Sequence, residues 1–194
     1  MVCELYPATP LLEDTAGFIP VLERALACCQ PAAMLLRLAP MPDTQAEAQL
    51  RLIQPIIQDR GIALMLEDRP ELARQAGCDG VHLSPDYRAH SVAEVRRLLG
   101  DTLQLGVGVG ASRDSAMRAG EDGADYICFA PEADAGADGL GQVVALAQWW
   151  VMMMELPVVA CAHDPEQIAA LVGSGADFVM PDTQWWDNPV SLPG

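Results

Sequence analysis

The sequence contains no lysine, and all 11 of its basic residues are arginine. Without lysine the chain has no side-chain amine to form a Schiff base with a carbonyl substrate, and no lysine ammonium group to hold a phosphate. Its 27 acidic residues outnumber the arginines and give a formal net charge of −16. A charge of that sign repels nucleic acid and anionic membranes, so we expect neither as a partner.

Two other features are missing from the sequence. None of the six cysteines forms a C-x-x-C pair and most lie in apolar stretches, so we expect reduced, structural thiols, with metal ligation as the alternative. No apolar run approaches the about 20 residues of a membrane span, and the start, MVCELYPATP, lacks the basic-then-apolar order of a signal peptide. We therefore expect one cytoplasmic domain over residues 1–194, with a large core because 51% of the residues are hydrophobic.

One short phrase occurs three times: GCDGVHL from Gly77, GADYICF from Gly123 and GADFVMP from Gly175. Each glycine suits the left-handed position that ends a helix, and the apolar residues after the aspartate are typical of a buried parallel strand. The intervals between copies have room for two strand–helix units each. We expect the repeated aspartate to be a structural residue where each strand begins, and not a catalytic one.

Short apolar runs alternate with helix signals along the whole chain. Two capping boxes, Thr44 to Glu47 and Ser91 to Glu94, and the phrase that begins Asp164-Pro165 predict helix starts. This alternation predicts a (β/α)8 barrel, a TIM barrel, with an open doubly wound sheet as the alternative. The predicted strands are residues 5–8, 33–38, 62–66, 80–83, 103–107, 126–130, 158–161 and 178–180.

The stretch after Met180, PDTQWWDNPVSLPG, is too short and too rich in proline for a full closing helix. We expect the eighth helix to be missing or reduced to a single turn, with Trp185 and Trp186 over the exposed seam. Together with Trp149 and Trp150, these side chains could form the interface of a homodimer. The alternative is that they pack inside one subunit.

In such a barrel the loops after the strands build the active site, so the residues that follow each apolar run are the candidates. Asp68 and Asp86 could share a Mg²⁺ ion, which takes one or two carboxylates together with water and phosphate oxygens. The rival interpretation is that Asp68 caps the helix that begins at Pro70, while Asp86 is a turn residue beside Pro85.

Two histidines and a glycine-rich run complete the candidates. His163 follows a strand and is the better general acid–base candidate, whereas His82 lies inside a strand, where a hydrogen-bonded core histidine is commoner. The run GVGVGA, which contains Gly108, lacks the full G-x-G-x-x-G spacing. Its glycines more simply keep a loop low over the mouth of the barrel.

At this point the chain resembles a known family. The run LEDRPELARQAGCDGVHLSPD is similar to the thiamine-phosphate synthase pattern, in which N-D-R leads through a short helix to G-A-D-G-V-H-L-G-Q-x-D. LGVGVGASRDSAMRAGEDGADYICFAP resembles the next two units, and PVVACAHDPEQIAALVGSGADFVM the last two. The resemblance implies a (β/α)8 barrel that joins a pyrimidine diphosphate to a thiazole phosphate in thiamine biosynthesis. It also implies Mg²⁺ on the leaving pyrophosphate and a small phosphorylated substrate as partner.

The resemblance also assigns roles to individual residues. Arg37 survives where LLRLA stands for the family's Q-L-R-E-K, and Asp68 and Arg69 survive in the triplet, in which Glu67 replaces asparagine. The family's second metal aspartate aligns with Tyr87, which leaves Asp86 one place early. The candidates are therefore catalytic Arg37, Asp68 and His163; substrate-binding Arg37, Glu67, Arg69, His82 and Gly108; and metal-binding Asp68 and Asp86.

The departures from the family pattern fall on its phosphate site. The acidic PEADAGADG, with Asp134 and Asp138, replaces a loop with a threonine–lysine pair; AHD, with Asp164, replaces G-G-I; and MPDT replaces V-S-A-I. The histidine of the family's tautomerase branch aligns with Gly110. We expect a synthase-like transferase with much of its phosphate site lost. The alternatives are a repurposed barrel that binds another small ligand or a protein partner, and an unrelated acid–base enzyme that uses His163.

Overall fold

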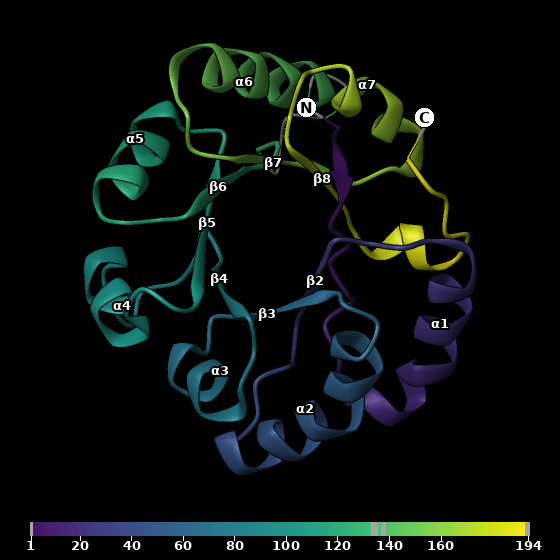
Figure 1. Cartoon of the computed structure of the whole chain (residues 1–194). Coiled ribbons are helices and arrows are strands. Elements are labelled where there is room, and N and C mark those ends of the chain that lie inside the picture. The colour runs from purple at the N-terminus through teal and green to yellow at the C-terminus, as the bar shows by residue number, and fades with distance from the viewer. Residues whose placement is uncertain (1, 133–135, 137–138, 193–194) are drawn as a thin grey trace.

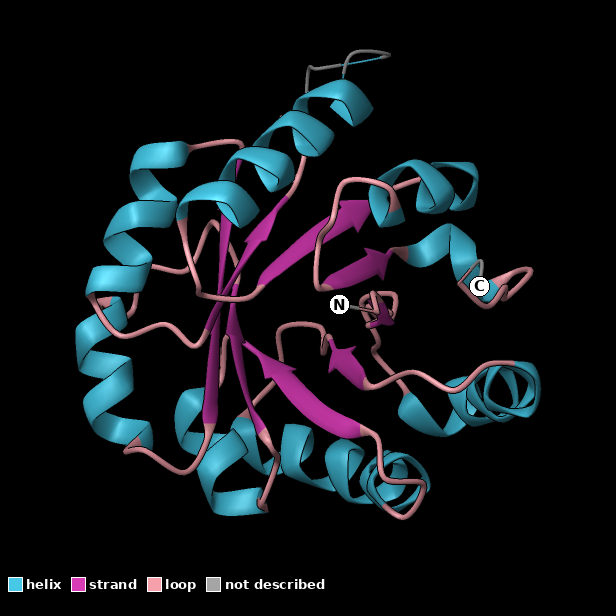
Figure 2. Ribbon diagram, turned by 45° about the horizontal axis from the view of Figure 1, so that its top comes forward, coloured by secondary structure: helices cyan, strands magenta, loops and turns pink. Residues whose placement is uncertain are grey.

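The computed structural model describes residues 2–132, 136 and 139–192. Eight parallel strands form one sheet in the order β1-β8-β7-β6-β5-β4-β3-β2, and two isolated bridges, Ala8 to Leu35 and Leu12 to Leu38, join the segment after β1 to β2. Figure 1 shows the strands as a ring with the helices around it, and Figure 2 shows the same helical layer from another side. The predicted (β/α)8 barrel is thereby confirmed, and the open sheet is wrong.

Each predicted apolar run overlaps one strand. The strands are β1 (Glu4–Leu5), β2 (Ala33–Leu36), β3 (Ala63–Glu67), β4 (Gly80–Leu83), β5 (Gln104–Gly110), β6 (Tyr126–Phe129), β7 (Val158–Ala162) and β8 (Phe178–Pro181). The helices are α1 (Thr15–Cys28), α2 (Asp43–Gln58), α3 (Pro70–Ala76), α4 (Val92–Leu99), α5 (Arg113–Glu121), α6 (Gly139–Met153), η2 (Pro165–Gln167), α7 (Ile168–Val172) and η3 (Thr183–Trp186).

The three repeated aspartates have the same structural role. Asp79 accepts a hydrogen bond from the backbone N–H of Leu64 at 2.7 Å. Asp125 accepts one from Leu105 at 2.7 Å, and Asp177 one from Val158 at 2.8 Å. In each case the carboxylate ties the entry of its own strand to the start of the preceding strand. The predicted structural role is confirmed.

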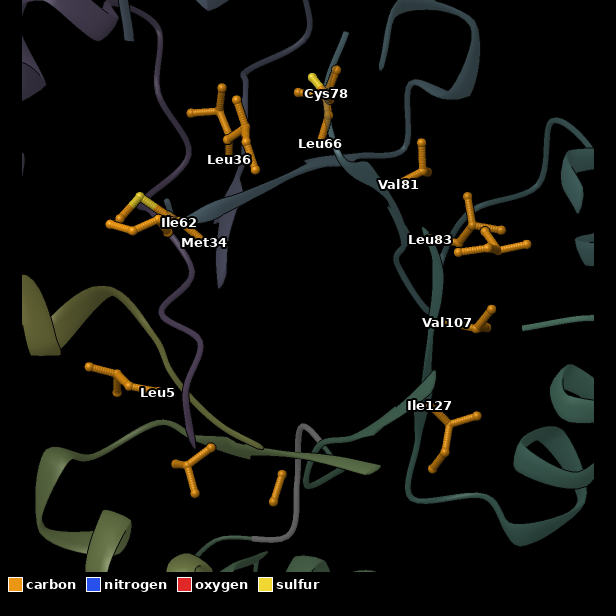
Figure 3. Packing of buried hydrophobic residues seen from close by; sticks show 14 of the residues in the cluster. Leu5, Met34, Leu36, Ile62, Leu66, Cys78, Val81, Leu83, Val107 and Ile127 are labelled. Carbon is orange, nitrogen blue, oxygen red and sulfur yellow. The ribbon is translucent and has the colours of Figure 1, made fainter. Parts of the chain in front are cut away.

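The core lies in two layers, because successive side chains of a strand point to opposite faces. Between strands and helices the buried side chains include Leu36, Val81, Leu83 and Ile127, which Figure 3 places on the outer side of the ring. A smaller cluster fills the inside of the barrel: Tyr6, Ala8, Leu35, Met65, Tyr126, Cys128, Val159 and Met180. Because this cluster occupies the interior of the barrel, the candidate functional side chains lie at the ends of the strands.

The helix starts agree with the sequence in two of three cases. The capping boxes at Ser91 and Asp164 are present, the second at the start of η2, which leads into α7. The box at Thr44 is wrong: α2 begins at Asp43 with Pro42 as its N-cap and without a side-chain cap. Thr44 therefore already lies inside the first turn, where its backbone is helical and cannot serve as a cap.

Only the 3-10 turn η3 follows β8 within the described residues, as the tail sequence predicts. Trp185 and Trp186 are buried beneath this turn, Trp150 is buried in α6, and the indole N–H of Trp186 donates to the Ala8 carbonyl at 2.7 Å. These three side chains pack inside the chain, as the alternative proposed. Trp149 is half-buried, with Arg113 4.6 Å from the centre of its ring. A homodimer stays a prediction, but these three buried tryptophans do not offer its surface.

No helix in the described part of the chain combines the length and the apolar character needed to cross a membrane.

Candidate functional site

A cavity of about 100 Å³ opens at the carboxyl ends of the strands, inside the ring that Figure 1 shows from the end. Parallel strands end at the same side of a barrel, so side chains that are far apart in sequence meet there. We call this cavity the mouth of the barrel. Four of the predicted site residues line it: Arg37, Glu67, His82 and Gly108. Its other lining residues are Ala8, Leu35, Ser84, Pro85, Cys128, Ala130, Cys161, Met180 and Asp182.

Arg37 follows β2 and is held between two carboxylates. Its Nη1 donates to Asp182 Oδ1 at 2.8 Å, and its Nε lies 3.6 Å from Glu67 Oε2. The Nε is buried and finds no hydrogen-bond partner among the described residues. No other arginine lines this cavity in the described part of the chain. Arg37, the one arginine that lines the cavity among the described residues, is therefore already engaged by Asp182.

Asp182, directly after β8, collects donors from several elements. Besides Arg37 it accepts the backbone N–H of Thr183 at 2.7 Å and the Thr183 hydroxyl at 3.0 Å, and its Oδ2 lies 3.5 Å from His163 Nδ1. The contact with His163 does most to lower the pKa of Asp182, with help from Arg37 and Thr183 and against the effect of burial. The same contact raises the pKa of His163. The pair therefore favours a carboxylate beside an imidazolium.

Glu67 ends β3 and pairs with His82 of β4 in the sheet. Burial raises the pKa of Glu67 to about 7; Arg37 lowers it, and the negative charges of Asp68 and Asp182 raise it. Glu67 therefore changes charge close to neutral pH, which suits a group that exchanges protons.

Asp68 has the only positive φ among the non-glycine residues described, 55°. Both of its carboxylate oxygens accept hydrogen bonds from Ser84, the backbone N–H at 2.7 Å and the hydroxyl at 2.6 Å. The alternative in which Asp68 caps the next helix is wrong, because α3 has Arg69 as its N-cap and no side-chain cap. Strained backbone held by such contacts is a feature of functional sites.

Arg69 and Asp86 lie outside the mouth cavity. Arg69 turns toward the start of α2, where it donates to Asp43 at 2.7 Å and to the Met41 carbonyl at 2.9 Å. It lines a separate acidic cavity with Asp43, Glu67 and Asp68. Asp86 is exposed and lines neither of these cavities. Asp134 and Asp138 lie outside the described residues.

His82 is buried, and its Nδ1 lies 3.1 Å from the hydroxyl of Tyr126, which in turn lies 2.7 Å from the hydroxyl of Tyr6. Burial, and then the positive charge of Arg37, lowers the pKa of His82 to about 4. The predicted hydrogen-bonded core histidine is confirmed, and it is neutral at physiological pH. Its place in the wall of the cavity also leaves it in reach of a small ligand.

Gly108 of β5 lines the cavity. A side chain does not fit at this position, because a Cβ would lie 2.8 Å from Pro85 Cδ. The cavity is also lined by Ser84, Cys128, Cys161 and Asp182, which were not among the predicted site residues. Asp182 and Ser84 each follow a strand, which was the available signal. The sulfurs of Cys128 and Cys161 lie 3.9 Å apart in the cavity wall, and their apolar neighbours in sequence gave no sign of this.

Three comparisons with known proteins agree. A family model described as "Thiamine monophosphate synthase" matches residues 5–180. The thiamine-phosphate synthase of Rhodospirillum centenum is 37% identical over 190 residues, 96% of this chain and 91% of the relative. That of Erythrobacter litoralis is 33% identical, over 95% of this chain and 89% of the relative. A solved structure, "Thiamine phosphate pyrophosphorylase from Pyrococcus furiosus", is 20% identical and superposes with a TM-score of 0.78 over 96% of this chain and 88% of its own.

Proposed function

The chain belongs to the thiamine monophosphate synthase family, and from that membership we propose that it joins a pyrimidine diphosphate to a thiazole phosphate at the mouth of its barrel. It is a thiamine-phosphate-synthase-like barrel of thiamine biosynthesis. The observation that carries the proposal is the family match over residues 5–180, which includes every residue that lines the cavity except Asp182. The names of the relatives favour this activity over a repurposed barrel.

Arg37, Glu67 and His82 are the cavity residues to which we assign substrate contacts. Arg37 is the cation of the mouth and would face the leaving diphosphate, in competition with Asp182. Neutral His82 would offer a hydrogen bond to a ring nitrogen or amino group. The carboxylate of Asp182, and that of Glu67 when it is ionised, would stabilise positive charge on a pyrimidine intermediate, because charges that the protein holds in place act strongly on a reacting group beside them.

His163, Arg69 and Gly108 have supporting roles in this proposal. His163 holds a proton beside Asp182 and is the candidate general acid for the departing group. Arg69 lies in the neighbouring acidic cavity, where it would meet the outer part of a phosphorylated substrate. Gly108 lets Pro85 pack closely against β5 at the wall of the mouth.

Mg²⁺ is the metal that the family implies, and the donors present fit it in one form. Among the described residues no three His, Cys, Asp or Glu side chains gather to hold a metal ion. A Mg²⁺ ion that keeps most of its water and arrives with phosphate oxygens needs only one or two carboxylates. Asp68 is the first candidate ligand and Asp86 the second. The ion would neutralise charge on the pyrophosphate.

The remaining expectations are part of the same proposal. We propose a small phosphorylated substrate and no nucleic-acid partner, in keeping with the net charge of −16. A cytoplasmic location and a homodimer stay predictions.

The purified full-length chain, incubated with the two precursors and Mg²⁺, is expected to form thiamine phosphate and release pyrophosphate. Arg37→Ala should lower kcat/KM by about tenfold to a hundredfold, because it removes a charged hydrogen-bond donor from the mouth. The matched control is Arg97→Ala, which removes the same charge from the exposed side of α4. Folded protein that yields no product at saturating substrate would remove the proposal.

A further inference from the structure

The carboxylate of Asp182 occupies a donor set of the kind that binds an external anion. A guanidinium from the end of β2, an imidazole from the end of β7, and a backbone N–H and a hydroxyl from η3 all face its two oxygens, at 2.8, 3.5, 2.7 and 3.0 Å respectively. Charged and backbone donors in this combination recognise carboxylate and phosphate groups in proteins. Here the chain supplies the anion itself.

The backbone holds that carboxylate in place. The Asp182 N–H donates to the Ala162 carbonyl at 3.0 Å, which fixes the residue to the end of β7. Asp182 is also the N-cap of η3, whose Trp185 and Trp186 are buried. Movement of the carboxylate out of the mouth would therefore disturb a helix cap and the packing below it. Asp182 is a resident group and not a loose side chain.

The charges that face Arg37 leave little attraction for a second anion. Asp182 is in direct contact with the guanidinium, and Glu67 approaches it from the other side at 3.6 Å. The imidazole of His163 adds positive charge, but this ring contacts the carboxylate of Asp182. His82 is buried and faces Tyr126. A phosphate that entered the mouth would meet a guanidinium whose charge Asp182 already balances, and it would lie near the carboxylates of Asp182 and Glu67; both effects weaken its binding.

We infer that Asp182 determines the charge class of the ligand: it is a built-in counter-ion for Arg37 that weakens phosphate binding and favours ligands that are neutral or cationic where they face β7 and β8. This goes beyond the proposed transfer reaction, because it concerns binding and holds with or without turnover. Its consequence for that reaction is a high KM for the phosphorylated substrates.

The test is isothermal titration of the full-length chain with inorganic phosphate and with pyrophosphate. Asp182→Asn is expected to bind pyrophosphate at least about tenfold more tightly than the unsubstituted chain, a difference of about 1.4 kcal/mol. The control Asp187→Asn makes the same change in net charge five positions along, at an exposed residue, and should leave the affinity unchanged. Adding Arg37→Ala to Asp182→Asn should remove the gain.

Two further measurements distinguish an effect of Asp182 on ligand selectivity from an effect of Asp182 on folding. The pKa of His163, followed by NMR, should fall when Asp182 becomes asparagine, since its principal partner loses its charge. If Asp182→Asn does not fold, Asp182→Ala with added acetate should restore both the fold and the raised pKa of His163, because acetate can refill the donor set.

Equal pyrophosphate affinity in the unsubstituted chain and in Asp182→Asn, or an equal gain in Asp187→Asn, would overturn the inference. These outcomes differ from a failure of the proposed reaction. Tighter binding without product in any variant would sink the synthase activity alone, whereas turnover with unchanged affinities would sink the role of Asp182 alone.

Discussion

At the scale of single residues, Glu67 shows how burial at the mouth changes the pKa of a side chain. Its carboxylate ends β3, 22% of its side chain is exposed, and its one cationic neighbour, Arg37, is shared with Asp182. The ion pair of Glu67 with Arg37, at 3.6 Å, does not offset the loss of hydration of the carboxylate, because Arg37 also contacts Asp182. Burial therefore stabilises the neutral, protonated form of Glu67 relative to the charged form. A family position that holds a neutral asparagine is thus occupied here by an acid whose neutral form is favoured.

This gives a prediction for stability. The pKa of Glu67 rises from 4.5 to about 7 on folding, so between these values the folded chain binds more protons and its free energy of unfolding falls as the pH rises. Glu67→Gln should lack this fall. Relative to the unsubstituted chain, it should gain about 2–3 kcal/mol of unfolding free energy between pH 4.5 and pH 8. Urea denaturation at the two pH values measures the difference.

The exposed Glu23 on α1 supplies the control for that experiment. Glu23→Gln removes the same charge, and the difference between it and the unsubstituted chain should change little over the same pH range. A flat difference for Glu67→Gln as well would contradict the raised pKa.

The sequence predicted which residues stand at the mouth better than it predicted their partners. Arg37 and Glu67 were found because each follows a predicted strand, and the ends of parallel strands converge. Asp68 was found in the same way but lines the neighbouring cavity. The pairing of Arg37 with Asp182 joins positions 145 residues apart in sequence, on two strand ends with β1 between them in the ring. The hydrogen bonds from Ser84 to the Asp68 carboxylate form where Asp68 has a positive φ, which few residues other than glycine adopt. The spacing of residues along the sequence predicts neither contact.

At the scale of elements, two capping boxes that look alike in sequence differ in structure. The Ser91 hydroxyl accepts the Glu94 N–H, and the Glu94 carboxylate accepts the Ser91 N–H, at the start of α4. Thr44 makes no such bond, because Pro42 takes the N-cap position and α2 starts before Thr44 is reached. The N-cap of α2 therefore lies two residues before the threonine at which the sequence pattern placed it.

Ser91→Ala should therefore lower the free energy of unfolding by about 1 kcal/mol, since it leaves the Glu94 amide without its cap. Thr44→Ala is the matched change at a threonine that caps nothing and should cost little. Equilibrium urea unfolding of the two variants side by side measures the contrast. Equal losses would mean that Thr44 acts as a cap in solution.

The strands were predictable for a related reason. Each repeated glycine has a positive φ at or just after the end of a helix: 76° at Gly77, which is the C-cap of α3, 100° at Gly123 and 84° at Gly175. Each aspartate after it ties two strands together, so the phrase marks a strand start in sequence and in structure. The ends of the strands were less certain, because β5 runs on through its glycines to Gly110, and apolar letters alone do not show where pairing stops.

At the scale of the whole molecule, the barrel is completed at its last position by a 3-10 turn. In η3 the two rings of Trp185 and Trp186 pack edge to face at 4.9 Å, and Trp186 also packs on Phe18 of α1 at 4.9 Å. Its indole N–H reaches the Ala8 carbonyl between β1 and β2. One turn with two large aromatic side chains therefore covers a seam that a full helix covers elsewhere in the ring.

Trp186→Ala should accordingly lower the free energy of unfolding by about 3–5 kcal/mol, the range for a large aromatic side chain removed from a core. Trp149→Ala, at a half-buried position on α6, should cost less. Far-UV circular dichroism in urea measures both losses without relying on tryptophan emission, and sedimentation velocity gives the oligomeric state. Because Trp186 is 2% exposed within one chain, its removal should leave the oligomeric state unchanged in protein that remains folded. A variant that kept its stability but lost a dimer would instead place Trp186 at a subunit interface.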